Sequence, residues 1–392
     1  MKPSKSILPI IVISQFCCTS LWFAGNSVIN DLIVNFNLKA DALGHLTSAV
    51  QFGFIIGTLV FAILTIADRF PPSKVFLISA VLGALFNLGV IYPANNITSL
   101  LLFRFFTGFF LAGIYPVGMK IAADYYQKGL GKSLGFLVGA LVLGTAFPHV
   151  LNQITGSFSW KSVILATSAL ALLGGFLMVF LVPDGPYRKP SQKTDLSIFL
   201  GVFKNREFRS VSFGYFGHMW ELYAFWTFVP IMLQKYSEKH HLVQFNIPLL
   251  SFIIIGIGGF ACILSGYIAQ TKGTKKTALI ALLLSGICCL ISPLFFSSNS
   301  ENLFIGFLLF WGMVVIADSP LLSTLVAQNA ASEIKGTALT IVNCIGFSIT
   351  IISIQFITKM LELTDSNSIY TILAIGPIFG LFMLRNKNAL KL

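Results

Sequence analysis

Apolar runs long enough to cross a membrane recur along the whole chain, separated by short polar breaks. An α-helix needs about 20 mostly apolar residues to span the hydrocarbon core of a bilayer. The composition points the same way, because 56% of the 392 residues are hydrophobic and only 10% are charged. The sequence therefore predicts an all-α membrane protein. It leaves no segment for a soluble catalytic domain, so we do not expect an enzyme.

Twelve of these runs are predicted to be spanning helices. They cover residues 7–33, 43–67, 75–93, 99–125, 133–155, 162–182, 210–235, 249–270, 277–297, 303–329, 337–360 and 368–384. Lys and Arg are concentrated on one side of the predicted membrane, with 19 residues against five on the other. Since cytoplasmic loops carry the excess of Lys and Arg, both termini are predicted to be cytoplasmic. Topology then explains the net charge of +12, and no nucleic-acid partner is expected.

The sequence divides into two similar halves. The longest polar stretch, residues 183–208, is predicted to be a cytoplasmic linker between six-helix bundles at 1–182 and 209–392. The segment AGIYP at 112–116 corresponds to a similar segment, ADSP at 317–320, roughly 204 residues later. Two parallel repeats of this kind are typical of one large class of transporters.

Four segments carry a recognisable pattern. The loop after the second span contains Asp68 and Arg69, which match the D-R of a G-x-x-x-D-R-x-G-R-[RK] loop, although its first Gly is replaced. The segment RFFTG at 104–108 is similar to an R-x-x-x-G motif. Residues 123–135 and 332–340 are similar to junctions of the form D-W-F-x-x-x-x-R-G-x-x-x-G. On these segments the chain resembles the major facilitator superfamily (MFS), in its organic-anion and nitrate-like branches.

The resemblance implies the MFS fold, with twelve transmembrane helices in two pseudo-symmetric six-helix bundles. It also implies alternating access by a monomer without a cofactor or metal, and a cytoplasmic gate that includes Asp68 and Arg69. Lys120 and Asp124 are four residues apart, which predicts a salt bridge at this gate, or else Lys120 reaches for the membrane surface. Gln51 stands in the second span, where nitrate-specific members carry Arg, so nitrate is not expected as the substrate.

Ionisable side chains inside the predicted spans are the candidates for function, because a charge at the bilayer centre costs at least about 2.5 kcal/mol. Glu221 and Asp318 are expected near the midplane, where the sites of such carriers lie. A desolvated carboxyl group can take up and release a proton, so both are predicted proton carriers, or else buried acids bonded to a neighbouring helix. His218 lies three residues before Glu221, and both lie on one helix face with Tyr215. These three residues and Asp318 are candidate substrate ligands.

Polar groups of the first half are also predicted to bind substrate. Arg104 and His149 both lie toward the outer ends of their spans and are predicted to form a positive corner for an anionic group. A guanidinium group suits carboxylate or phosphate because it donates two parallel hydrogen bonds. The alternative is that Arg104 is a structural hub bonded to backbone carbonyl groups. Trp22 and Asn26 of the first span and Gln51 of the second are predicted to supply further polar contacts.

Together these features predict proton-coupled uptake of a small organic anion or zwitterion across the bacterial inner membrane. The exchanger pattern of the fifth span is degenerate, with Phe147 before Pro148 in place of Gly, which favours uptake over efflux. An exporter of drugs or siderophore-like molecules, and a solute sensor that does not transport, are the alternatives. The expected partners are the small-molecule substrate, protons and membrane lipid.

Overall fold

The computed structural model describes residues 6–126, 130–154, 159–188, 201–240, 243–330 and 335–385. These residues are mostly helical, with no β-strand among them. The chain forms two compact units, Met1–Thr194 and Asp195–Leu392, which we call the N-terminal and C-terminal units. Parts of the predicted linker (189–200) and of the two predicted junctions (127–129 and 332–334) lie outside the described residues.

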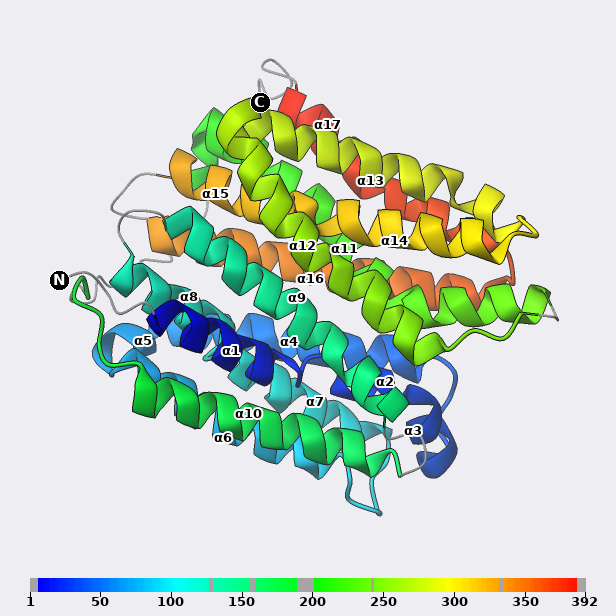
Figure 1. Cartoon of the computed structure of the whole chain (residues 1–392), viewed down its shortest axis with the longest axis horizontal. Helices are drawn as coiled ribbons and strands as arrows, with labels where there is room; N and C mark the ends of the chain where they lie inside the picture. Colours follow the sequence, from blue (N-terminus) through cyan, green and yellow to red (C-terminus); the bar gives the residue numbers. More distant parts are fainter. Residues whose placement is uncertain are drawn as a thin grey trace. The chain divides into compact units, whose positions relative to one another are not determined.

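The helices of the N-terminal unit are drawn from blue to green in Figure 1. They are α1 (Ile7–Thr19), α2 (Ala24–Ser27), α3 (Ile29–Phe36), α4 (Ala42–Ile63), α5 (Ile66–Arg69), α6 (Pro72–Gly89), α7 (Ile97–Leu111), α8 (Tyr115–Tyr125), α9 (Leu130–Ile154) and α10 (Lys161–Leu181). The C-terminal unit begins with a short 3₁₀ turn. Its elements are η2 (Val202–Lys204), α11 (Arg206–Lys239), α12 (Ile247–Lys272), α13 (Thr274–Phe296), α14 (Glu301–Ala317), α15 (Ser319–Asn329), α16 (Lys335–Leu363), η4 (Asn367–Ala374) and α17 (Ile375–Arg385).

The predicted twelve-span architecture is confirmed. Among the described residues, ten helical segments are long and apolar enough to cross a membrane. The interrupted first span, from α1 to α3, and the 34-residue helix α11 complete the set. The polar and aromatic side chains of α11 make it less apolar than the other spans.

Three spans are interrupted. The first was expected as one helix over 7–33, which is wrong, because the helix stops at Thr19 and resumes at Ala24. The fourth span divides between α7 and α8 and the tenth between α14 and α15, and each new helix carries a proline in its first turn. Proline fits the first turn of a helix, where its missing N–H leaves no intrahelical hydrogen bond unmade. The repeated AGIYP and ADSP segments are therefore equivalent helix breaks.

The same close contact between two helices occurs within each unit. In the N-terminal unit α4 and α7 lie side by side (Figure 1), and a Cβ atom added to Gly108 would lie 2.0 Å from the Val50 carbonyl oxygen. In the C-terminal unit α12 packs on α14, and a Cβ atom added to Gly312 would lie 2.1 Å from the Ile254 carbonyl oxygen. Both pairs of equivalent residues are 204 apart in sequence. Small residues permit this close approach of membrane helices, so the internal repeat extends to the packing.

Candidate functional site

Arg104 of α7 places its guanidinium group at the break in the first span. Nη1 and Nη2 each lie 3.2 Å from the Leu21 carbonyl oxygen, and Nη2 donates to the Trp22 carbonyl oxygen at 2.5 Å. Carbonyl groups at a helix break lack the donors that a continuous helix provides. Arg104 supplies such donors, so the structure agrees with the alternative in which this side chain is a structural hub.

Arg104 is also connected to the sixth span through Asn87 of α6. Nη1 donates to Asn87 Oδ1 at 3.1 Å, and Asn87 Nδ2 donates to Thr167 Oγ1 at 3.2 Å and to Ser168 Oγ at 2.9 Å on α10. All these partners are neutral. Arg104 is 1% exposed, and its Nε has no hydrogen-bond partner among the described residues. The guanidinium is thus a buried cation with no counter-ion among the residues that the structure describes.

Polar residues of α4 line the same break in the first span. Asn26 Nδ2 donates to Thr47 Oγ1 at 2.8 Å, and the Trp22 ring lies 4.9 Å from the Phe54 ring, centroid to centroid. Gln51 lies one helical turn from both Thr47 and Phe54, on the same face of α4. Neither atom of its side-chain amide has a hydrogen-bond partner in the described parts of the chain. The break therefore gathers Trp22, Asn26 and Gln51 in the region that also holds the Arg104 guanidinium.

His149 is buried on α9 at 3% exposure, and its Nε2 lacks a hydrogen-bond partner within the described ranges. Three residues further on, Asn152 Nδ2 donates to the Ser27 carbonyl oxygen at 2.5 Å, so this end of α9 packs on α2. No hydrogen bond joins His149 to Arg104 among the described residues. Their joint action on an anion stays a prediction.

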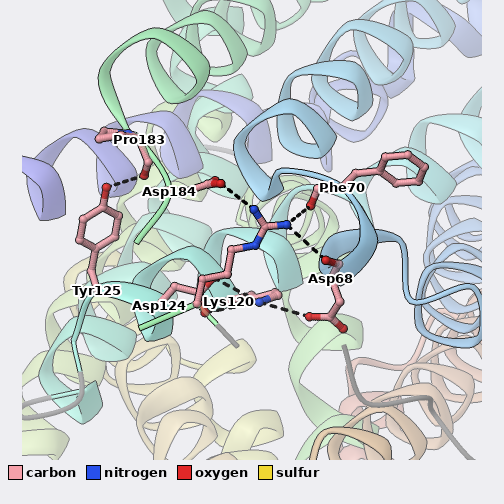
Figure 2. A network of polar contacts seen from close by, with 8 residues as sticks. Asp68, Phe70, Lys120, Asp124, Tyr125, Pro183 and Asp184 are labelled. Atoms are coloured by element: carbon pink, nitrogen blue, oxygen red, sulfur yellow. Dashed lines mark hydrogen bonds and ion pairs between the residues drawn. The ribbon is translucent and has the colours of Figure 1, made fainter. Parts of the chain in front are cut away.

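Lys120 bridges two carboxylates where α5 meets α8 (Figure 2). Its Nζ lies 3.2 Å from Asp68 Oδ1 and 3.2 Å from Asp124 Oδ2, and all three side chains are partly shielded from solvent. Arg69, predicted to belong to this gate, is exposed and makes no ion pair in the part of the chain that the structure describes. The spacing of Lys120 and Asp124 identified their pair, while the bridge to Asp68 required the fold.

Arg188 takes the position at this cluster that the sequence assigned to Arg69. Its Nη2 donates to the carbonyl oxygens of Asp68 at 3.2 Å and Phe70 at 2.9 Å, and its Nη1 lies 2.6 Å from Asp184 Oδ2. The segment after α10 is thereby fastened to α5. Arg188 lies within the predicted linker 183–208, and no local signal in the sequence distinguishes it from its neighbours.

His218 of α11 and Asp318 at the α14–α15 break form a buried pair. His218 Nδ1 lies 2.9 Å from Asp318 Oδ1, and the two side chains are 1% and 0% exposed. His218 Nε2 and both carboxylate oxygens of Asp318 have no hydrogen-bond partner among the described residues, so the contact is an ion pair. The pair joins α11 to the break in the tenth span and retains an unused polar atom on each residue.

Glu221 of α11 is bonded to neutral donors from two neighbouring helices. Its Oε1 accepts from Trp311 Nε1 on α14 at 2.6 Å and from Cys289 Sγ on α13 at 3.2 Å. Its Oε2 accepts a short hydrogen bond from Ser285 Oγ, also on α13. The alternative of a buried acid bonded to neighbouring helices describes Glu221 in this structure, and a Trp, Ser or Cys in an apolar run gives little signal of such a role.

His218 and Glu221 share a helix but have separate partners. Glu221, His218 and Asp318 are all buried in the C-terminal unit, and we call these three residues the acid–histidine cluster. Tyr215 lies beside it, with its ring centroid 6.0 Å from that of His218. A Cβ atom added to Gly346 would lie 2.7 Å from Tyr215 Cε1, so Tyr215 also packs on α16.

Comparisons with known proteins bear on this arrangement. The family model described as Major Facilitator Superfamily matches residues 11–354. The chain is 22% identical over 382 residues to the bicyclomycin resistance protein homolog of Haemophilus influenzae, covering 91% of this chain and 90% of that protein. It is 24% identical over 344 residues to the niacin transporter NiaP of Acinetobacter baylyi, covering 72% of this chain and 73% of NiaP.

A shorter match joins the chain to the 4-hydroxybenzoate transporter PcaK of Acinetobacter baylyi. It is 27% identical over 163 residues, covering 39% of this chain and 33% of PcaK. Among solved structures, the proton:xylose symporter XylE bound to 6-bromo-6-deoxy-D-glucose superposes with a TM-score of 0.73. The identity is 16%, over 96% of this chain and 94% of that one, and the likeness therefore concerns the fold.

Proposed function

We propose a transport function from one premise: the chain belongs to the major facilitator superfamily, whose family model matches residues 11–354. In this proposal the protein is a secondary active transporter that takes up a small organic anion across the bacterial inner membrane by alternating access. Protons move in the same direction as the anion. The acid–histidine cluster binds the proton, and polar groups at the break in the first span bind the anion.

The observation that carries the choice of an anion is the buried charge of Arg104. Its hydrogen-bond partners among the described residues are neutral, and its side chain is 1% exposed. A buried cation without a counter-ion is unfavourable, and an anionic substrate supplies the missing charge. Gly25 packs against the guanidinium group, because a Cβ atom there would lie 3.3 Å from Nε. Gln51 offers a second polar contact through its unused amide.

Two relatives suggest the first substrates to assay. NiaP is named for niacin and PcaK for 4-hydroxybenzoate, and both compounds are aromatic monocarboxylates at neutral pH. A guanidinium group matches the geometry of a carboxylate. We therefore place aromatic monocarboxylates first among the candidate substrates, and zwitterions such as amino acids second.

Proton coupling is supported by the contrast between the two units. The N-terminal unit holds a buried cation, whereas the C-terminal unit holds two buried acids beside a histidine. Ionisable groups in membrane spans mark proton relays and substrate paths. Binding a proton at the cluster with an anion in the other unit balances the charge of the loaded carrier.

Export is the second candidate function. The match to the bicyclomycin resistance protein homolog covers 91% of this chain, more than the match to NiaP or to PcaK. An exporter that exchanges protons for its substrate would use the same cluster in the opposite direction. The direction of substrate movement relative to the proton gradient separates the two functions.

Proteoliposomes that contain the purified protein provide the test. Initial rates of uptake of labelled nicotinate, 4-hydroxybenzoate and an amino-acid pool are measured with and without an inward proton gradient. Protein-free liposomes are the control, because the neutral acid forms also cross lipid down a pH gradient. Protein-dependent uptake stimulated by the inward gradient is expected. Uptake stimulated only by an outward proton gradient would indicate exchange of protons for substrate and favour export. No protein-dependent flux of any probe would contradict uptake of these substrates.

A further inference from the structure

We propose that the proton exchanged during transport is carried by the imidazole ring of His218, at Nε2, and that Asp318 is the positioning residue for this ring. The inference rests on the proton-coupled transport proposed above and names the atom on which the coupling depends. It differs from the sequence prediction, which assigned the proton to the carboxyl groups of Glu221 and Asp318.

The contact between His218 and Asp318 determines which ring nitrogen is available. Nδ1 lies 2.9 Å from Asp318 Oδ1, and a carboxylate at this distance favours a proton on Nδ1. Nε2 of the neutral ring then holds the lone pair. Because Nε2 has no hydrogen-bond partner among the described residues, it is the atom of the ring that can accept an incoming proton. Asp318 supplies the charge that balances the resulting imidazolium.

The carboxylate of Asp318 is directed to His218 instead of to its own helix. Asp318 occupies the N-cap position of α15, where aspartate commonly bonds a first-turn N–H. Its backbone angles are helical there (φ −84°, ψ −19°), and its side chain makes no capping bond. By contrast Ser300, at the N-cap of α14, accepts from Leu303 N at 3.4 Å. Asp318 thus leaves α15 without a side-chain cap and contacts the imidazole.

The pair connects a continuous span to an interrupted one. α11 is unbroken from Arg206 to Lys239, whereas Asp318 separates α14 from α15. A change of angle at this break moves the carboxylate relative to His218. Separation removes the counter-charge of the imidazolium and favours release of the proton. Protonation of His218 and the arrangement of the tenth span are therefore linked in both directions.

The titratable neighbours of the pair are Tyr215 and Glu221 on α11 and Cys262 on α12. The packed helices also carry Cys288 and Cys289 on α13, which lie at Glu221, and buried Cys344 on α16. No Lys or Arg in the described ranges makes an ion pair with His218 or Asp318. Thiols and phenols are neutral near pH 7 in their ordinary state. Glu221 is consequently the other acid whose charge acts on the pair.

The test compares the pH dependence of uptake in matched variants, with labelled nicotinate and 4-hydroxybenzoate as probes. His218→Gln keeps a side chain that can donate to Asp318 but cannot bind a proton. His45→Gln is the control, because His45 also pairs with an aspartate, Asp41 at 3.3 Å, but has a 43% exposed side chain. Size-exclusion profiles check folding. Exchange of probe at equal concentration and pH on both sides measures the steps that need no net proton movement.

Each outcome supports or overturns the assignment. Above the pH at which a site titrates, its protonated fraction falls about tenfold per pH unit, so wild-type and His45→Gln uptake should fall steeply with rising external pH. His218→Gln should lose this dependence and gradient stimulation while retaining exchange. Asp318→Asn should move the profile to more acid pH. If His218→Gln retains the wild-type gradient stimulation and profile, the proposal is overturned.

A second readout is independent of transport. The chain has five histidines, so ¹⁵N-histidine NMR of the protein in nanodiscs, with His218→Gln for assignment, can report the His218 tautomer. We expect a proton on Nδ1 and titration at Nε2, with the tautomer preference lost in Asp318→Asn. A proton on Nε2 in the neutral ring would overturn the assignment. If wild-type protein shows no proton-dependent flux, the proposed function fails, while this spectrum still tests the His218–Asp318 geometry.

Discussion

Gly108 and Gly312 occupy equivalent positions in the two units, and each faces a backbone carbonyl oxygen of the adjacent helix. A Cβ atom would lie 2.0 Å from Val50 O at the first and 2.1 Å from Ile254 O at the second. No side chain fits at these distances. The repeat therefore preserves a contact between helix backbones, on which the functional residues of α7 and α14 depend for their placement.

Gly108→Ala is expected to destabilise the protein by about 1–3 kcal/mol, because the added methyl group forces α4 and α7 apart. Thermal unfolding in detergent measures the change. Gly306→Ala on α14 is the control, since a Cβ atom there meets nothing within 4 Å and alanine is the better helix former. Equal stability of the two variants would show that the helix contact is less close than described.

Arg104→Lys retains the charge but loses the planar donor group that contacts Leu21, Trp22 and Asn87. If Arg104 binds the anion, the KM for nicotinate should rise about tenfold, which corresponds to about 1.4 kcal/mol. Asn87→Ala removes a neutral part of the same network and is the control for structural damage. A similar loss of stability in both variants, with no difference in KM, would assign Arg104 a structural role only.

Lys120→Gln should lower stability by about 1 kcal/mol or less, because the pairs with Asp68 and Asp124 are partly exposed to solvent. The difference from wild type should shrink at high salt, since screening weakens the same pairs. Unfolding midpoints at low and high ionic strength measure it. Arg69→Gln should show no such effect, and a salt-dependent loss of stability in that variant would contradict the exposed position of Arg69.

Trp311→Phe removes the donor that lies 2.6 Å from Glu221 Oε1. A hydrogen bond to a charged acceptor contributes about 1.5–3 kcal/mol, against about 0.5–1.5 kcal/mol for a neutral one. Trp220→Phe is the matched control, because the Trp220 indole donates to the Ile372 carbonyl oxygen at 3.2 Å. A larger loss of unfolding free energy for Trp311→Phe is expected if Glu221 is ionised. Equal losses would indicate that Glu221 is neutral.

Much of the fold could be predicted because it depends on patterns formed by residues that are close in sequence. Hydropathy gives the spans, and the AGIYP and ADSP segments give the repeat, but the helix breaks at these segments were seen only in the structure. The break in the first span also escaped prediction. Residues 20–23 are as apolar as their surroundings and include no proline, so nothing local opposes a continuous helix there.

Less of the candidate functional site than of the fold could be predicted from the sequence. Charge within an apolar span was enough to single out Arg104, His218, Glu221 and Asp318, because membrane helices rarely tolerate such residues without a role. The pairing of Lys120 with Asp124 also followed from their spacing on one helix. Arg188 and Trp311 carried no signal, since their contacts are made with residues far away in the chain.

The sequence by itself determined that this chain lies in a membrane, how many times it crosses, and which ionisable residues lie within the spans. Tertiary structure decided that His218 meets Asp318 and Glu221 meets Trp311, and that Arg104 bonds the interrupted first span. The reason is physical. Hydropathy and helix spacing are properties of neighbouring residues, whereas the partner of a buried polar group depends on how each helix is rotated and where its neighbour breaks.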